Sequence, residues 1–358
     1  MNFRKYVSLL GVAVLCVSFF AACGDDTEEG KIEPLASSFY VLNRGNFQAN
    51  NASISYYDVT KNTLNEKFYE DANGSGLGDS AEDILVYGSK IYVTVTSSNR
   101  LAILDMDGKL LKSIEPEYET GDPKNPRYMK ALDGKVYVSY YYGHSVAVLD
   151  TTSLDIENEI KVGRYPEQIA IANNKLYVAN SGGLDTNYGE TVSVMDIPTL
   201  TVEKDIKVVV NPNRLAVNSK GDVFVISMGN YGDIPNTLQR IDGATGEVTK
   251  LGEGTYMDIV KDKIYVLYAP YYTPEQTCVA KYDALTSKLE SADLIPALNK
   301  VNTLSGIRVE PTSGQIYVMN SPYTETGSLS VYNSAGSPIV EKMDTKGYSP
   351  NALWFVGK

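Results

Sequence analysis

Short, strongly apolar segments with an aromatic residue at the centre recur along the chain. There are seven of them: Phe39-Tyr40-Val41, Ile91-Tyr92-Val93, Val136-Tyr137-Val138, Leu176-Tyr177-Val178, Val223-Phe224-Val225, Ile264-Tyr265-Val266 and Ile316-Tyr317-Val318. Successive central aromatics lie 40 to 52 residues apart, a spacing typical of propeller blades with about four strands each. Because the segments are rich in β-branched and aromatic residues, each predicts a β-strand.

The apolar residues of these segments occupy both faces of the predicted strand, where a half-exposed strand would alternate apolar and polar residues. A strand with two apolar faces must be covered on both sides, and blades stacked around an axis provide that cover. A two-sheet sandwich would leave one face wet and show a cleaner period of two. The pattern therefore favours an all-β propeller over a sandwich.

The two ends of the repeat region predict how the ring closes. Residues 39–358 have room for seven units of this length, and the first unit begins directly at its second strand, residues 39–42. The missing first strand has a match at the other end, because residues 348–356 resemble the opening strand of a unit such as residues 165–171. We therefore predict a seven-bladed β-propeller in which a C-terminal strand completes the N-terminal blade and leaves no exposed terminal edge.

The N-terminus has the organisation of a secretion signal over residues 1–22. Basic residues are followed by an apolar run over residues 7–20, which is shorter than the roughly 20 residues that a membrane-spanning helix needs. The stretch that ends at Cys23 resembles a bacterial lipobox, which implies lipidation of Cys23; a secreted protein with an incidental cysteine is the alternative. Residues 23–38 form a predicted tether, whose acidic start resembles the export tag of surface lipoproteins in Bacteroidetes-type bacteria.

Charge and composition argue against several classes of function. The formal net charge of −12 opposes binding to nucleic acid or to anionic lipid through a basic patch. A single histidine, His144, excludes a multi-histidine metal site and argues against a histidine-based triad. The segment 105–108 resembles the start of a calcium loop, but Pro116 stands where the ligating Glu belongs, which favours a hairpin turn. We therefore expect no catalytic residue, no metal and no cofactor.

Candidate binding residues gather in two sets of loops, those after the second strand of each unit and those before the first. In a four-stranded blade both sets open on the same face, and they contain four of the seven arginines that follow the predicted signal. Tyrosine, with 27 copies against 8 Phe and 1 Trp, offers rigid apolar area with a hydrogen-bonding tip. For a loop tyrosine the alternative is a role in capping a blade, for a loop arginine it is surface pairing with Asp or Glu, and for His144 it is a role in loop structure. The candidates are Arg44, Phe47, Arg127, Tyr128, Tyr142, His144, Arg164, Tyr165, Asn180, Tyr188, Arg214, Tyr231, Tyr256, Tyr271, Tyr272, Tyr323 and Tyr348.

The unit has Pro before the first strand, Lys-Leu/Ile-Tyr-Val in the second and a Val-Asp type of ending in the third, as in residues 145–150. It resembles YncE-like seven-bladed propellers over nearly all of residues 39–358. Together with the lipobox, the acidic leader and the tyrosine-rich loops, the chain resembles the BtuG-type lipoproteins. That resemblance implies a non-enzymatic outer-membrane protein on the cell surface, held by its lipid anchor, which captures cobalamin (vitamin B12) or another corrinoid and passes it to a TonB-dependent transporter. It assigns no contact residue.

Two other classes of function remain open from the residues alone. Tyrosine-rich faces also stack on sugars, so a module that binds glycans or peptidoglycan fragments is one alternative. A propeller lactonase is the other, although the sequence offers no convincing cluster of carboxylate, Asn and His ligands for its metal.

Overall fold

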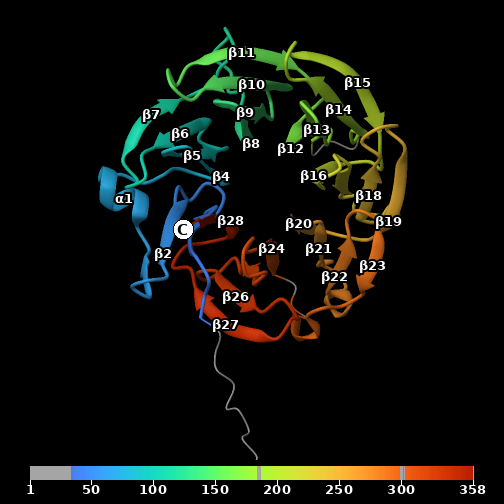
Figure 1. The fold of residues 1–358 in the computed structure, drawn as a ribbon. Helices are drawn as coiled ribbons and strands as arrows, with labels where there is room; N and C mark the ends of the chain where they lie inside the picture. Colours follow the sequence, from blue (N-terminus) through green and yellow to red (C-terminus); the bar gives the residue numbers. More distant parts are fainter. Residues whose placement is uncertain (1–33, 184–186, 299–300, 302, 358) are drawn as a thin grey trace, which may run out of the picture. The chain divides into compact units, whose positions relative to one another are not determined.

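The computed structural model describes residues 34–183, 187–298, 301 and 303–357. These residues form seven four-stranded antiparallel sheets, which are arranged as blades around a common axis (Figure 1). The predicted all-β, seven-bladed propeller is therefore confirmed. The predicted signal peptide, the lipidation at Cys23 and most of the predicted tether lie outside the described residues. The last tether residues lie within them, and the Ser37 hydroxyl donates to Glu310 of the last blade at 2.9 Å.

The blades are numbered in the order in which they occur along the chain. In each blade, the strand that is named first lies nearest the axis (Figure 1). Blade 1 contains β28 (Pro350–Val356), β1 (Ser38–Asn43), β2 (Ser53–Asp58) and β3 (Thr63–Asn65). Blade 2 contains β4 (Ala81–Tyr87), β5 (Lys90–Val95), β6 (Arg100–Leu104) and β7 (Leu110–Ile114). Blade 3 contains β8 (Pro126–Leu132), β9 (Lys135–Tyr140), β10 (Ser145–Asp150) and β11 (Ile156–Lys161). Blade 4 contains β12 (Pro166–Ala172), β13 (Lys175–Asn180), β14 (Thr191–Asp196) and β15 (Thr201–Lys207).

The remaining blades have the same order. Blade 5 contains β16 (Pro212–Val217), β17 (Val223–Ser227), β18 (Thr237–Ile241) and β19 (Val248–Gly252). Blade 6 contains β20 (Tyr256–Val260), β21 (Lys263–Tyr268), β22 (Cys278–Asp283) and β23 (Lys288–Ser291). Blade 7 contains β24 (Leu304–Val309), β25 (Ile316–Asn320), β26 (Ser328–Tyr332) and β27 (Pro338–Asp344). The short helices are α1 (Phe68–Asn73), η1 (Pro274–Gln276) and η2 (Pro296–Leu298).

The ring closes through the C-terminal strand, as the sequence predicts. β28 pairs with β1 in antiparallel register, with Ser38 opposite Val356 and Leu42 opposite Ala352. β28 also contacts the inner strands of both neighbouring blades, β24 and β4. The inner edge of β1 is therefore paired, and blade 1 has four strands like the other six.

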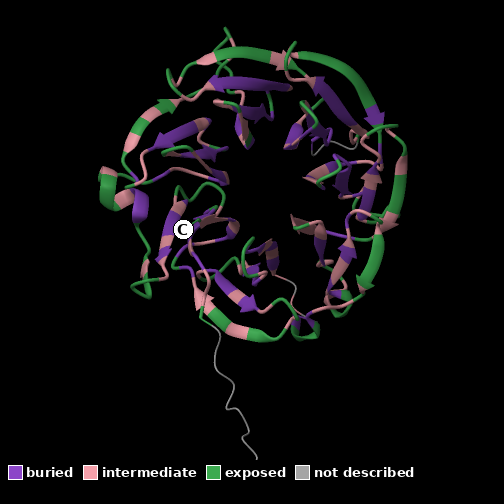
Figure 2. Cartoon of the chain, viewed as in Figure 1, coloured by how far each residue is buried: buried purple, intermediate pink, exposed green. Residues whose placement is uncertain are grey.

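The apolar segments bury both of their faces because each one is the second strand of a blade. In blade 2, Tyr92 packs in the core shared with blade 3, while Ile91 and Val93 pack in the core shared with blade 1. The same alternation recurs around the ring, so that one apolar cluster lies at each of the seven blade interfaces. Figure 2 shows the result as buried middle strands and more exposed outer strands.

The charges that recur in the repeat unit are explained by pairing inside the blade. Lys135 lies opposite Asp150 in the register of β9 and β10, and their side chains meet at 2.8 Å. Lys263 and Asp283 make the equivalent pair in blade 6 at 2.9 Å. Surface pairs of this kind contribute only about 0–1 kcal/mol each. The recurring Lys and Asp residues of the unit therefore indicate the fold and give no information about the ligand.

The calcium-like segment forms a turn. Asp105 Oδ1 accepts the backbone N–H groups of Asp107 at 3.0 Å and Lys109 at 2.9 Å, and Gly108 has a positive φ of 86°, which glycine adopts without strain. In the described part of the chain, no group of three or more His, Cys, Asp or Glu side chains is placed to hold a metal ion. The described residues include no helix long and apolar enough to cross a membrane.

Candidate functional site

The loops after the second strands and those before the first strands share one face of the propeller, as predicted. Backbone hydrogen bonds join the two loops of a single blade, for example Arg44 N–H to Ser349 O at 2.9 Å in blade 1 and Tyr141 N–H to Asn125 O at 2.9 Å in blade 3. We call this side of the molecule the loop face.

Irregular pairing at the start of the inner strands brings polar residues to the axis on the loop face. In six blades the register between the first and second strands shifts at this point, as it does at a β-bulge. A bulge adds one residue and redirects side chains away from the regular alternation. The affected positions are Glu82, Arg127–Tyr128, Glu167–Gln168, Asn213, Ser305 and Asn351.

Three of these residues form a network with two arginines that lie close to them. We call this network the charge cluster, and it consists of Arg44, Glu82, Arg127, Glu167 and Arg214. Arg127 lies between the two carboxylates, at 2.5 Å from Glu167 and 3.9 Å from Glu82. Arg44 approaches Glu82 at 3.5 Å. The two carboxylates are almost completely buried, with 6% of Glu82 and 3% of Glu167 exposed. Buried charges of this kind are tolerated only when they are paired.

The surroundings act differently on the two buried carboxyl groups. Burial alone would raise the pKa of Glu82, but Arg127, Arg44 and Arg214 outweigh burial and lower the pKa to about 2. For Glu167, burial raises the pKa even though Arg127 opposes the shift. Glu82 is therefore an anion at neutral pH, and it holds the arginines in place around the axis.

Two tyrosines, Tyr128 and Tyr256, complete the charge cluster. The Tyr128 hydroxyl donates to Glu82 at 2.9 Å and accepts from an Nη of Arg214 at 2.9 Å. The Arg214 guanidinium also lies over the ring of Tyr256, at 5.1 Å from its centroid, a cation–π contact. Burial raises the pKa of Tyr256, so its hydroxyl stays neutral. Arg214 is thus held between residues of blades 3 and 6.

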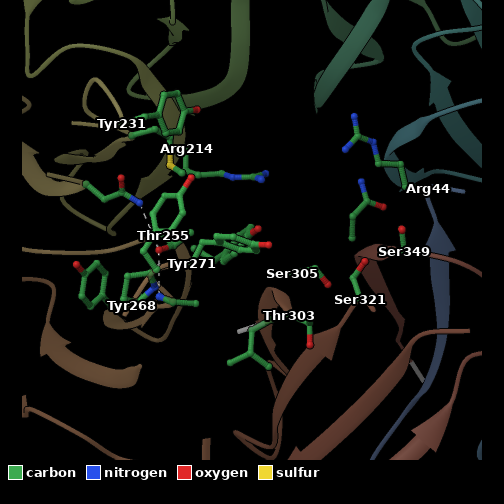
Figure 3. A pocket seen from close by; sticks show the side chains of 18 of the residues that line it. Arg44, Arg214, Tyr231, Thr255, Tyr268, Tyr271, Thr303, Ser305, Ser321 and Ser349 are labelled. Carbon is green, nitrogen blue, oxygen red and sulfur yellow. Dashed lines mark hydrogen bonds between the residues drawn. The ribbon is translucent and has the colours of Figure 1, made fainter. Parts of the chain in front are cut away.

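A cavity of about 780 Å³ opens beside the charge cluster on the loop face. One wall is aromatic and includes Tyr231, Tyr268 and Tyr271, whereas the other presents the hydroxyl groups of Thr303, Ser305, Ser321 and Ser349 (Figure 3). Arg214 and Arg44 reach in from different sides (Figure 3). A cavity of this size suits a small molecule, since ligand sites usually measure about 300–1,000 Å³.

Eight of the candidates predicted from the sequence line this cavity: Arg44, Phe47, Arg214, Tyr231, Tyr256, Tyr271, Tyr272 and Tyr323. Several of these side chains are strongly exposed, with 88% of Tyr272 and 78% of Tyr323 accessible to solvent. Large exposed aromatic residues gathered at the rim of a cavity are typical of a binding surface.

Four other candidates form a separate aromatic group on blades 3 and 4. The rings of Tyr142 and Tyr165 lie 5.8 Å apart, and Arg164 lies over the Tyr165 ring at 5.6 Å. His144 Nδ1 accepts the Tyr165 backbone N–H at 3.0 Å, and burial together with Lys161 and Arg164 lowers the pKa of the imidazole. None of these four residues lines the cavity.

The last five candidates do not line the cavity either. Arg127 and Tyr128 belong to the charge cluster behind it. Asn180 is buried in blade 4, where its amide donates to Ser193 at 2.9 Å, so its side chain stabilises the blade. Tyr188 lies against Tyr231, with ring centroids 6.0 Å apart, and Tyr348 lies in the loop before β28.

Four features of the site were not among the residues predicted from the sequence: Glu82, Glu167, Tyr268 and the hydroxyl wall. A signal for the two glutamates was present, because each is followed, after one more polar residue, by a short apolar run, residues 84–86 and 169–171. The hydroxyl residues carry no such signal, since Ser and Thr are common in exposed loops.

The model of one protein family, described as Domain of unknown function (DUF5074), matches residues 37–355. Among curated proteins, none matches the chain. A solved Quinonprotein alcohol dehydrogenase-like protein from Bacteroides thetaiotaomicron is 19% identical, with a TM-score of 0.58 over 89% of this chain and 78% of that one.

Two further solved structures are similar. A functionally unknown protein from Desulfotomaculum acetoxidans is 12% identical, with a TM-score of 0.62 over 89% of this chain and 99% of that one. A putative 6-phosphogluconolactonase from Bacteroides fragilis is 12% identical, with a TM-score of 0.60 over 91% of this chain and 100% of that one. At such low identity these similarities support the fold alone.

Proposed function

This chain belongs to the DUF5074 family, and we propose that it is a non-enzymatic binding protein that captures cobalamin or a related corrinoid in the cavity of the loop face. The proposal rests mainly on the contrast between the two walls of that cavity. Tyr231, Tyr268 and Tyr271 lie on one side, and the hydroxyl groups of Thr303 and Ser321 lie on the other.

A corrinoid has matching chemistry. It is a large, mainly flat molecule whose apolar ring edge is rimmed by amide groups. Tyrosine rings can pack against the edge, while hydroxyl and amide groups can hydrogen-bond to the amides. The part of the ligand that the cavity does not enclose would contact the exposed aromatic rim, which includes Phe47, Tyr272 and Tyr323.

Because of the predicted lipoprotein leader, we propose that this binding step takes place at the outer cell surface. A protein held by a lipidated Cys23 at the outer cell surface would meet scarce corrinoid outside the cell. Its acidic tether would let the propeller approach a TonB-dependent outer-membrane transporter, to which the ligand would pass. Both the location and the transporter belong to the proposal.

Retention of the coloured ligand tests the proposal directly. Purified protein is mixed with excess cyanocobalamin and passed over a gel-filtration column, and the fractions are read at a visible corrinoid absorption band. We expect the colour to elute with the protein at about one ligand per chain. Loss of all colour from the protein peak, with a folded chain by circular dichroism, would refute the proposal.

A module for glycans is the second candidate, and the exposure of Tyr271, Tyr272 and Tyr323 favours it, because exposed aromatic faces stack on sugar rings. The two candidates separate on a glycan array. Retention on the array by a chain without affinity for corrinoid would favour the glycan module.

A further inference from the structure

Two arginines of the charge cluster face the cavity from different blades. Arg44 extends from the loop after β1, and Arg214 extends from the inner strand β16 (Figure 3). Both line the cavity together with the Glu82 carboxylate that lies behind them. Positive charge is therefore presented to any bound molecule at the axis, next to the hydroxyl wall.

The charge cluster carries an excess of positive charge. Its three guanidinium groups face two carboxylates, Glu82 and Glu167, so one positive charge is not balanced within the cluster. Arginine keeps its charge at any physiological pH. The excess is notable in a chain whose formal net charge is −12, because it lies where ligand binding is proposed.

Both arginines also keep hydrogen-bond donors available. A guanidinium has five N–H donors in a planar fork. Arg214 gives one of these donors to Tyr128 at 2.9 Å. Arg44 comes no closer than 3.5 Å to Glu82, and 45% of its side chain is exposed. Two forks with remaining donors suit an oxyanion, which accepts such bonds in pairs.

We propose that Arg44 and Arg214 form a subsite for the phosphodiester of a ligand. A phosphodiester carries one negative charge, which matches the one unbalanced positive charge of the cluster. The inference rests on the proposed function, because it concerns the part of a corrinoid that differs between complete and incomplete forms. A complete corrinoid carries a nucleotide joined through a phosphodiester, and a cobinamide lacks it. The subsite makes the protein selective for complete corrinoids.

The test compares two ligands on matched variants by isothermal titration. The ligands are cyanocobalamin and dicyanocobinamide, and the variants are Arg44→Gln, Arg44→Lys and Lys346→Gln. Lys346 is the control, because it is an exposed cation in the loop before β28 that pairs with Asp344 at 2.9 Å and does not line the cavity. Arg44 lies in an exposed loop, so its replacement should leave the fold intact.

We expect the unmodified protein to bind cyanocobalamin about 10- to 100-fold more tightly than dicyanocobinamide, as the loss of charged hydrogen bonds implies. Arg44→Gln should remove most of this preference by weakening cyanocobalamin binding, with cobinamide affinity changed by less than about threefold. Arg44→Lys should keep an intermediate preference, and Lys346→Gln should keep all of it. Added salt should also reduce the preference.

Equal affinity for the two ligands, with no effect of Arg44→Gln on either, would overturn the subsite and leave the corrinoid proposal standing. A uniform loss of affinity for both ligands in Arg44→Gln would also overturn the subsite, since it would indicate a general role in binding. Binding of neither ligand to the unmodified protein would overturn the proposed function and the subsite with it.

Discussion

Glu82 and Asp83 are neighbours in β4, yet their surroundings shift the pKa values of their carboxyl groups in opposite directions. Three arginines overcome the burial of Glu82 and bring its pKa to about 2. Burial raises the pKa of Asp83 to about 6, although Lys130 and Arg308 oppose the shift. The side chain of Asp83 points to the neighbouring blade, where its Oδ2 accepts the N–H of Met129 at 2.8 Å.

These opposite shifts predict opposite effects of pH on stability. Asp83 binds its proton more tightly in the folded chain than in the unfolded chain, where its pKa is about 3.9. Its contribution to the free energy of unfolding should therefore fall as pH rises from about 4 to about 6. The contribution of Glu82 should be complete above the unfolded pKa of about 4.3 and should be lost as pH falls towards about 2.

Urea unfolding of Asp83→Asn at several pH values between 4 and 6 tests this prediction. Asn is neutral throughout, so the variant should gain stability relative to the unmodified protein as pH rises through this window. A constant difference in unfolding free energy across the window would contradict the shift assigned to Asp83.

At the rim of the cavity, Tyr271 and Tyr272 are the residues whose removal should affect binding most simply. They are 67% and 88% exposed, so replacing both with Ala should leave stability within about 0.5 kcal/mol. Loss of two aromatic contacts should raise the dissociation constant for cyanocobalamin by about tenfold or more. Tyr142→Ala is the matched control, because this exposed tyrosine of blade 3 lies outside the cavity. Unchanged affinity in the double variant would mean that blade 6 does not face the ligand.

At the scale of elements, the closing strand β28 shows how residues far apart in the sequence complete one blade. Leu353 is opposite Val41 in the register and is 1% exposed, in the apolar cluster between blades 7 and 1. Because closure depends on this packing, removal of the side chain should open a cavity at the point where the ring is joined.

Leu353→Ala should therefore lower the free energy of unfolding by about 2–5 kcal/mol. The same replacement at Leu289, which is 46% exposed in the outer strand β23, is the control and should cost less than about 1 kcal/mol. Chemical denaturation measures both. Equal losses in the two variants would contradict the role assigned to β28.

The inner strands also explain why the site was only partly predictable. Apolar periodicity predicts the seven second strands and the closure, because both faces of those strands are buried. It does not predict the irregular pairing that places Glu82 and Ser305 at the axis, since that depends on the register with the next strand. Nor does it separate the tyrosines of blade 6 from the group around Tyr165, because loop conformation decides which of them share a cavity.

At the scale of the whole molecule, the propeller is a scaffold whose seven similar interfaces carry dissimilar loops. Each blade interface contains an apolar cluster, whereas the loop face is divided into a cavity with Arg44 and Arg214 and a second aromatic group around Tyr165. Such a scaffold tolerates changes in its loops without loss of the fold, so ligand identity must be argued from the cavity.

Isothermal titration of the purified protein with cyanocobalamin is the decisive test of corrinoid binding in this cavity. We expect saturable binding of one ligand per chain, and weaker binding when Tyr271 and Tyr272 are both replaced. Absence of heat, together with an unchanged melting temperature at a large excess of ligand, would refute corrinoid binding, because a ligand that binds the folded state must stabilise it.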